Sequence, residues 1–392
     1  MQHVSSPKST VLFSTRLLTL YSLSLLFGIS LGLFNPLMST FMEQQQVSQI
    51  SIGIHSTIYF LAITVGTPFV NKLLRQQGIR RVLLLGLLLM GLSAPFFALT
   101  SYLSLWLIIR ILMGFGVCCL LIGGQTALNY FSHENNRARV NGFYFLAMGL
   151  GLIIGTIFGP HFYSLNPQFA FLMGGGVVVS AFLLVLFCLK KKFMVSIPTS
   201  SSLRLLPLLK KFKFPIHGIF AYGIANATLI TLYPVFILNQ NYNVEQMGLT
   251  LSMFFLGNLL STVPVTNLAD KLGKTRVLFM CVSVGIIVTL GLIVINNYSL
   301  ILLFSGLAGA SIGPIYPLCL ALVGEQVTSK ELGAGIALFT TSYSLGNAAG
   351  PILSSLMMAM FGNRFIFSAF IPLYIFLLLR MRGMGKKQLN FE

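Results

Sequence analysis

The feature that most constrains this chain is a series of long apolar runs. Twelve of them can supply the ~20 apolar residues that a membrane-spanning helix needs: residues 17–42, 47–70, 82–99, 103–129, 140–163, 169–189, 215–238, 247–268, 277–295, 300–324, 333–361 and 365–379. Only 8% of the residues are charged, whereas a water-soluble globule needs roughly 25%. We therefore expect an all-α membrane protein with twelve transmembrane helices.

The basic residues predict how the chain is oriented. The formal net charge of +18 could suggest a nucleic-acid partner, but the bias of Lys and Arg toward cytoplasmic loops accounts for it without one. With the N-terminus inside, 23 of the 25 basic residues fall in cytoplasmic segments, Arg364 falls outside and Arg110 falls within a span. We expect both termini to be cytoplasmic.

A repeated motif indicates that the chain consists of two related halves. The segment Gly155-Thr-Ile-Phe-Gly159-Pro160 recurs, at an offset of 191 residues, as Gly346-Asn-Ala-Ala-Gly350-Pro351, and the same offset places Glu134 on Glu325. Between the halves, a basic segment at 190–214 interrupts the apolar runs. We expect an N-terminal six-helix bundle (1–189), a cytoplasmic linker (190–214) and a C-terminal six-helix bundle (215–392), related by pseudo-symmetry. Membrane proteins built in this way often transport solutes at the interface between the halves.

Polar residues at helical spacing predict the lining of a central cavity. Residues at i, i+4 and i+11 share a helix face, and polar groups rarely face lipid. The predicted cavity residues are Asn35, His55, Tyr59, Tyr222, Asn226, Tyr233, Tyr316, Tyr343 and Asn347. Any one of them could equally hold two helices together.

Arg110 is a separate candidate, because a charge at the bilayer centre costs ~2.5–3.5 kcal/mol. All seven acidic residues lie outside the spans or at their ends. Arg110 therefore either bonds neighbouring backbone and shapes the fold, or attracts an anionic group of a substrate.

Three motifs resemble those of the major facilitator superfamily. Asp270-Lys271-Leu-Gly273-Lys274-Thr-Arg276, between the eighth and ninth runs, is similar to the family's G-x-L-A-D-R-x-G-R-K loop. Arg110-Ile-Leu-Met-Gly114-Phe-Gly116 resembles its R-x-x-x-G-x-G pattern, and the repeated Gly-x-x-x-Gly-Pro segments resemble its fifth-span motif. The first-half loop departs from the family pattern, because Asn71 replaces the Asp and extra residues precede Gly78. The segments 316–325 and 342–351 are similar to a branch related to YcaD.

The resemblance covers essentially the whole chain and implies the fold of that superfamily, with two bundles that rock about a central site. In the family, the loop Asp latches the cytoplasmic side shut, which suggests a partner for Asp270 near residues 139–142. We also expect Glu325 to pair with Lys271 or Lys274, and Glu134 with Arg80 or Arg81. The predicted gating residues are Asp270, Lys271, Gly273, Lys274, Glu134, Glu325, Gly155, Gly159, Pro160, Gly346, Gly350 and Pro351.

The resulting hypothesis is a secondary active transporter in a bacterial cytoplasmic (inner) membrane. It would move a small organic solute, amphipathic or anionic. Export is favoured because, in the superfamily, the fifth-span motif is associated with exporters. Protons are a candidate coupling ion, and we expect a monomer without cofactor or metal. A solute importer, an uncoupled facilitator and a membrane sensor stay open as alternatives. An enzyme is not expected, because both G-x-S-x-G matches lie within long apolar runs that contain no acid.

Overall fold

The computed structural model describes residues 12–133, 135–189, 212–326 and 331–388, and within these ranges the regular elements are all helices. The first half comprises α1 (Thr15–Gln44), α2 (Gln49–Gln77), α3 (Ile79–Ser93), the 3-10 helix η1 (Ala94–Leu99), α4 (Leu103–Phe131), α5 (Arg137–Leu165) and α6 (Pro167–Cys188). The second comprises α8 (Lys213–Thr231), α9 (Tyr233–Leu238), α10 (Val244–Leu272), α11 (Lys274–Val294), α12 (Tyr298–Ile312), α13 (Ile315–Gln326), α14 (Leu332–Phe361), η2 (Asn363–Ala369) and α15 (Ile371–Gln388).

The helices match the expected all-α membrane fold. In the described residues, ten helical segments are long and apolar enough to cross a membrane, and three of them join two consecutive helices: α3 with η1, α12 with α13, and η2 with α15. The other two expected spans correspond to α8 with α9, and to α14. Glu134 and nearly all of the expected linker, residues 190–211, lie outside the described residues.

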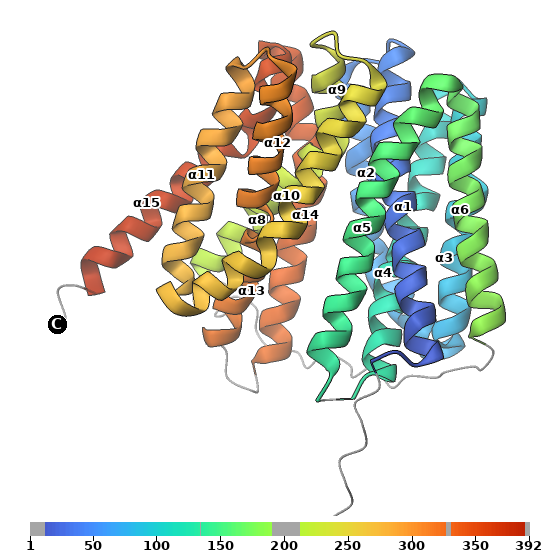
Figure 1. Ribbon diagram of the computed structural model, residues 1–392, viewed down its shortest axis with the longest axis horizontal. Coiled ribbons are helices and arrows are strands. Elements are labelled where there is room, and N and C mark those ends of the chain that lie inside the picture. The colour runs from blue at the N-terminus through green and yellow to red at the C-terminus, as the bar shows by residue number, and fades with distance from the viewer. Residues whose placement is uncertain (1–11, 134, 190–211, 327–330, 389–392) are drawn as a thin grey trace, which may run out of the picture.

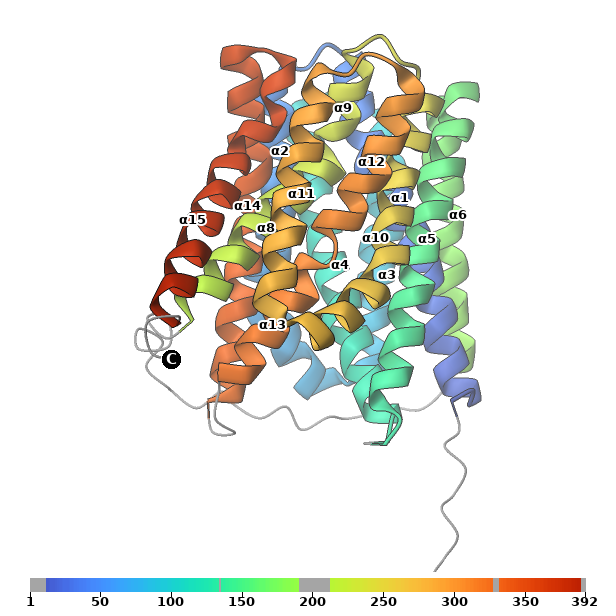
Figure 2. The ribbon, with the colours of Figure 1, turned by 60° about the vertical axis from the view of Figure 1, so that its left-hand side comes forward.

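The two halves stand side by side, with α1–α6 on one side and α8–α15 on the other (Figure 1). The start of α1 and the end of α15 lie at the same end of the molecule (Figures 1 and 2). We call this the basic end, because Arg16, Arg75, Arg137 and Lys274 occupy helix termini there. The opposite end, which carries Glu43, Glu245 and Arg364, we call the neutral end. The ribbons of the two halves approach each other at the neutral end and diverge toward the basic end (Figure 1).

The repeated Gly-x-x-x-Gly-Pro motif packs in the same way in both halves. A Cβ atom added at Gly155 of α5 would lie 2.2 Å from the carbonyl oxygen of Ile29 in α1, and one added at Gly346 of α14 would lie 2.3 Å from that of Phe220 in α8. Only glycine permits such close approach of two helix backbones. The motif glycines therefore hold the first and fifth helices of each half together.

The prolines of the same motif face the other half. The ring of Pro160 lies against Gly248 of α10, where a Cβ would be 2.4 Å from its Cγ atom. The carbonyl oxygen of Pro351 lies against Gly53 of α2, where a Cβ would be 2.8 Å away. Within six residues, the motif thus contacts both its own half and the partner half.

Two spans of the C-terminal half are each divided into two α-helices. Leu232 separates α8 from α9, and Gly313-Pro314 separates α12 from α13. Proline lacks the N–H that a continuous helix would need at that point. The corresponding spans of the N-terminal half, α1 and α4, run without a break over 30 and 29 residues.

Candidate functional site

Five of the predicted cavity residues meet near the middle of the C-terminal half. We call Tyr222, Asn226, Tyr316, Tyr343 and Asn347 the tyrosine–amide cluster. The ring centroids of Tyr222 and Tyr343 are 5.8 Å apart in a stacked arrangement, and those of Tyr316 and Tyr343 are 5.2 Å apart, edge to face. Asn226 Nδ2 donates hydrogen bonds to Tyr343 Oη and to Asn347 Oδ1, each at 3.2 Å. Helices α8, α13 and α14 thus bring three aromatic rings and two amides together.

The cluster combines two kinds of recognition chemistry. Asn226, Tyr316 and Tyr343 are half-buried, whereas Tyr222 and Asn347 are buried. Aromatic faces favour flat or apolar groups, and amides both donate and accept hydrogen bonds. Such a surface suits an uncharged amphipathic molecule.

Tyr233 was predicted to share a face with Tyr222 and Asn226, and in this structure it contacts a different set of side chains. The i+11 spacing assumes one continuous helix, but α8 ends at Thr231. Beyond the break, Tyr233 is buried against Phe236, with 5.7 Å between the ring centroids, and its hydroxyl shares a 2.7 Å hydrogen bond with Ser305. It contributes to packing and not to the cluster.

Asn35, Tyr59 and Arg110 form a second group, inside the N-terminal half. The guanidinium carbon of Arg110 lies 5.8 Å from the ring centroid of Tyr59 and 5.7 Å from that of Phe97. Asn35 Nδ2 donates to Tyr59 Oη at 3.5 Å. Arg110 is completely buried, and its three guanidinium nitrogens make no hydrogen bond to the described residues. The predicted bonds from Arg110 to neighbouring backbone are thus not present, and its main contacts are the two aromatic faces.

His55 packs between two helices of the N-terminal half. It is buried, and its ring nitrogens face two carbonyl oxygens, with Nδ1 2.7 Å from Ser51 O and Nε2 3.1 Å from Leu103 O. These contacts tie α2 to the first turn of α4. In this structure His55 does not reach the tyrosine–amide cluster.

Hydrogen bonds join the two halves near the neutral end. Thr156 Oγ1 and Ser252 Oγ lie 2.9 Å apart between α5 and α10. Closer to that end, Glu245 Oε1 lies 3.0 Å from His161 Nδ1 and accepts from Ser164 Oγ at 2.8 Å. Glu43 of α1 also lies beside the Asn239 side chain. We call the contacts of Thr156, His161 and Ser164 with Ser252 and Glu245 the neutral-end seam.

The sequence did not reveal this seam. Hydroxyl, imidazole and carboxylate side chains at helix ends are common, and their pairing depends on how two distant helices cross. One feature of the sequence does point to contacts between the halves. Gly53 and Gly248 occupy equivalent positions, each five residues after the residue that caps its helix, Ser48 or Asn243. Both glycines contact the opposite half.

The halves lose contact toward the basic end. A Cβ at Gly149 of α5 would still lie 2.9 Å from Leu259 of α10. One turn further along each helix, Leu146 and Val263 are 43% and 64% exposed. Between α5 and α10, the two halves are therefore in contact toward the neutral end and lose contact toward the basic end.

The loop that resembles the family latch is not engaged in this conformation. Asp270 is exposed and makes no hydrogen bond or ion pair with the described residues. A Cβ at Gly142, within the expected partner region, would have nothing within 4 Å. Gly273 has a φ of +91°, which favours glycine. Lys274 forms an ion pair with Glu325, one of the two pairings expected for that acid.

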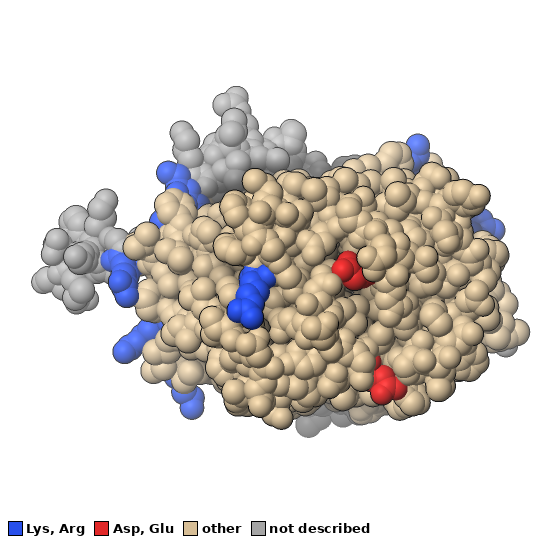
Figure 3. All heavy atoms as spheres, turned by 90° about the horizontal axis from the view of Figure 1, so that it is seen from above, with Lys and Arg blue, Asp and Glu red and all other residues tan. Residues whose placement is uncertain are grey.

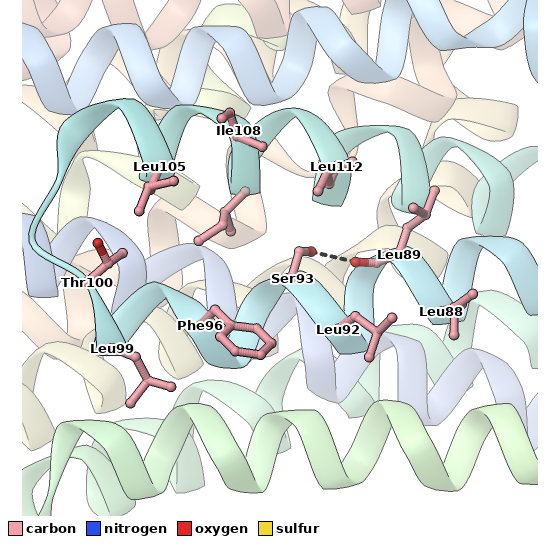
Figure 4. A pocket seen from close by; sticks show the side chains of 11 residues that line it. Leu88, Leu89, Leu92, Ser93, Phe96, Leu99, Thr100, Leu105, Ile108 and Leu112 are labelled. Atoms are coloured by element: carbon pink, nitrogen blue, oxygen red, sulfur yellow. Dashed lines mark hydrogen bonds between the residues drawn. The ribbon is translucent and has the colours of Figure 1, made fainter.

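Two surface hollows lie apart from these groups. One is a groove of about 440 Å³ between α3, η1 and α4, lined almost entirely by apolar side chains such as Leu92, Phe96 and Ile108 (Figure 4). Its Ser93 hydroxyl donates to the Leu89 carbonyl. The other, of about 290 Å³, is a polar hollow at the neutral end, around Asn239 and Arg364. Charged side chains are sparse on the face seen from that end (Figure 3).

Comparisons with known proteins agree with the fold and its two halves. A family profile described as Major Facilitator Superfamily matches residues 20–213 and 216–386. The chain is 26% identical over 348 residues to YfkF of Bacillus subtilis (strain 168), covering 87% of this chain and 88% of YfkF, and 22% identical over 365 residues to YcaD of Salmonella enteritidis PT4, covering 92% and 94%. Both relatives are described as uncharacterized MFS-type transporters.

Solved structures show the same fold at low sequence identity. The nucleoside transporter NupG superimposes with a TM-score of 0.74 at 13% identity, over 95% of this chain and 98% of NupG. A D-xylose-proton symporter superimposes with a TM-score of 0.74 at 16% identity, over 94% and 96%. Both halves, the loop at Asp270 and the repeated fifth-span motif fall within the matched ranges. This chain belongs to the major facilitator superfamily of membrane transporters, not to an enzyme family.

Proposed function

We propose that the protein is a monomeric secondary active transporter that exports a small, amphipathic organic solute across a bacterial cytoplasmic membrane by alternating access. The observation that carries this proposal is the asymmetry of the interface, which is bonded at the neutral end and open at the basic end. We place the basic end in the cytoplasm, because Lys and Arg collect on that side of membrane proteins. On this assignment the structure represents the inward-open state, which an exporter uses to take up its solute.

The tyrosine–amide cluster is the proposed solute-binding surface. Tyr316 follows the Gly313-Pro314 interruption, and non-helical backbone at membrane depth is tolerated where it is buried in protein or lines a water-filled cavity. Among the described residues of the N-terminal half, the predicted group around Arg110 is not such a surface, because Arg110 is completely buried against Tyr59 and Phe97. We therefore favour an uncharged amphipathic solute over an anionic one.

An uncoupled facilitator is the second candidate function. Proton-coupled transport needs a group that takes up and releases protons during the cycle, and the described spans carry acids only near their ends. No carboxylate belongs to the tyrosine–amide cluster. Solute flux without dependence on a proton gradient would favour this alternative.

The test begins with a thermal-shift screen of the purified protein against metabolites and drugs, followed by flux measurements in proteoliposomes with and without an imposed proton gradient. Tyr343→Phe removes the hydroxyl that accepts from Asn226, and we expect weaker solute binding by about 0.5–1.5 kcal/mol. Tyr102→Phe is the matched control, because Tyr102 is exposed at the neutral end and lies outside the cluster. Equal affinity in both variants would reject the cluster as the binding surface.

A further inference from the structure

A histidine and a carboxylate meet across the two halves at the neutral end. His161 lies near the end of α5, and Glu245 lies in the first turn of α10. His161 Nδ1 is 3.0 Å from Glu245 Oε1, and the two side chains are 57% and 46% exposed. Both groups can exchange protons with the surrounding water. Since α5 and α10 belong to different halves, the contact exists only while the neutral end is closed.

We propose that His161 and Glu245 form a proton-binding site, and that a proton bound there favours the conformation in which the neutral end is closed. This site goes beyond the proposed transport function and does not depend on which solute is carried. A neutral imidazole donates from Nδ1 in only one of its two tautomers. The imidazolium always carries the Nδ1–H and adds a charge opposite to that of the carboxylate.

The sign of the effect follows from linkage. Protonated His161 gains a carboxylate partner in the closed state and loses it when α5 and α10 separate. The closed state therefore binds the proton more tightly, and acidification shifts the population toward it. Ser164 bonds the same carboxylate oxygen at 2.8 Å and keeps it oriented toward α5.

The elements packed against α5 and α10 bring few other ionisable groups to this end. Among the described residues these are Glu43 on α1, Tyr163 on α5 itself, Tyr233 on α9 and Tyr298 on α12; α6 and α11 bring none to this end. Glu43 lies beside Asn239, and Tyr163 donates to Gln44 at 2.7 Å. Tyr298 donates to the Gln246 carbonyl at 3.0 Å. The arginine within α4, Arg110, is buried inside the first half. None of these groups competes with His161 as a cation for Glu245.

The expected effect is modest, because water screens an exposed ion pair. Such a pair shifts an equilibrium by up to about fivefold. A shift of that size is still relevant for a transporter whose two conformations are close in free energy.

The experiment measures the distance between the halves at the neutral end as a function of pH. Spin labels are placed at Tyr102 in the N-terminal half and at Met360 in the C-terminal half, and both positions are exposed. Double electron–electron resonance in nanodiscs then reports the closed and open populations. The full chain is used, with its native cysteines replaced. From about pH 8 to about pH 5, we expect the closed-to-open ratio to rise by up to about fivefold.

Three variants make the assignment specific. His161→Gln should abolish the pH dependence, and Glu245→Gln should reduce it at least by half. His133→Gln, which removes an exposed histidine at the basic end, should leave it unchanged. The proposal is overturned if the wild-type ratio is constant or falls on acidification, or if His161→Gln titrates like the wild type.

Discussion

Replacing Gly248 by alanine should open the neutral end of the transporter. Gly248 of α10 contacts α5 of the other half, and an added Cβ would lie 2.4 Å from Pro160 Cγ and 2.5 Å from the Thr156 carbonyl oxygen. Ordinary van der Waals contact begins at 3.4 Å, so the helices must separate locally by about 1 Å (3.4 minus 2.4). Neither neighbour is a flexible side chain that could turn aside.

The magnitude follows from the cost of overpacking. An extra methyl group in a close contact costs about 1–3 kcal/mol, and this cost applies only while the halves are in contact. The closed-to-open ratio should therefore fall by roughly 5- to 150-fold. Alanine also favours a helix over glycine by about 0.5–1 kcal/mol, but it does so in both conformations and cancels from the ratio.

The spin-label pair at Tyr102 and Met360 measures this ratio directly. Gly176→Ala is the matched control, because Gly176 lies in α6 with nothing within 4 Å of an added Cβ. We expect the control to retain the wild-type distance distribution. An unchanged distribution in Gly248→Ala would refute the conclusion that this contact holds the halves together.

Three further outcomes are expected. Ser252→Ala removes the bond to Thr156 across the seam and should lower the closed-to-open ratio by an amount that corresponds to about 0.5–1.5 kcal/mol, measured with the same labels; an unchanged ratio would contradict it. Arg110→Met should leave the melting temperature unchanged or raise it, because the buried guanidinium lacks hydrogen-bond partners among the described residues; a marked drop in a thermal melt would reveal a partner. Lys274→Gln breaks the exposed pair with Glu325 and should change the free energy of unfolding by less than about 1 kcal/mol, a difference that high salt should remove.

The sequence predicted the helices and most of the tyrosine–amide cluster. Apolar run length is a local property, so all twelve spans could be recognised. Asn226, Tyr343 and Asn347 were placed on inward faces because they lie on uninterrupted stretches, where the helical period applies. For Tyr233 the same spacing assumed one continuous helix, whereas α8 ends at Thr231 and Tyr233 is buried beside Phe236 and Ser305.

Contacts between the halves could not be predicted from periodicity. The pairing of His161 with Glu245 depends on the crossing of α5 and α10, which are far apart in the sequence. The unengaged state of Asp270 depends on conformation, which a sequence pattern does not specify. The pairing of Glu325 with Lys274 was predictable, because both residues belong to neighbouring segments of one half at the same end.

The two divided spans of the C-terminal half differ in stiffness from their counterparts in the N-terminal half. A continuous helix resists bending through its unbroken ladder of hydrogen bonds, and proline or glycine interruptions weaken that resistance. In the C-terminal half, Leu232 and Gly313-Pro314 provide two such flexural points, whereas the counterparts α1 and α4 are single helices, with Pro36 inside α1. In mechanical terms, the divided spans act as jointed rods where their counterparts are single rods. Between these matched spans, we expect deformation during the transport cycle to concentrate in α8–α9 and α12–α13.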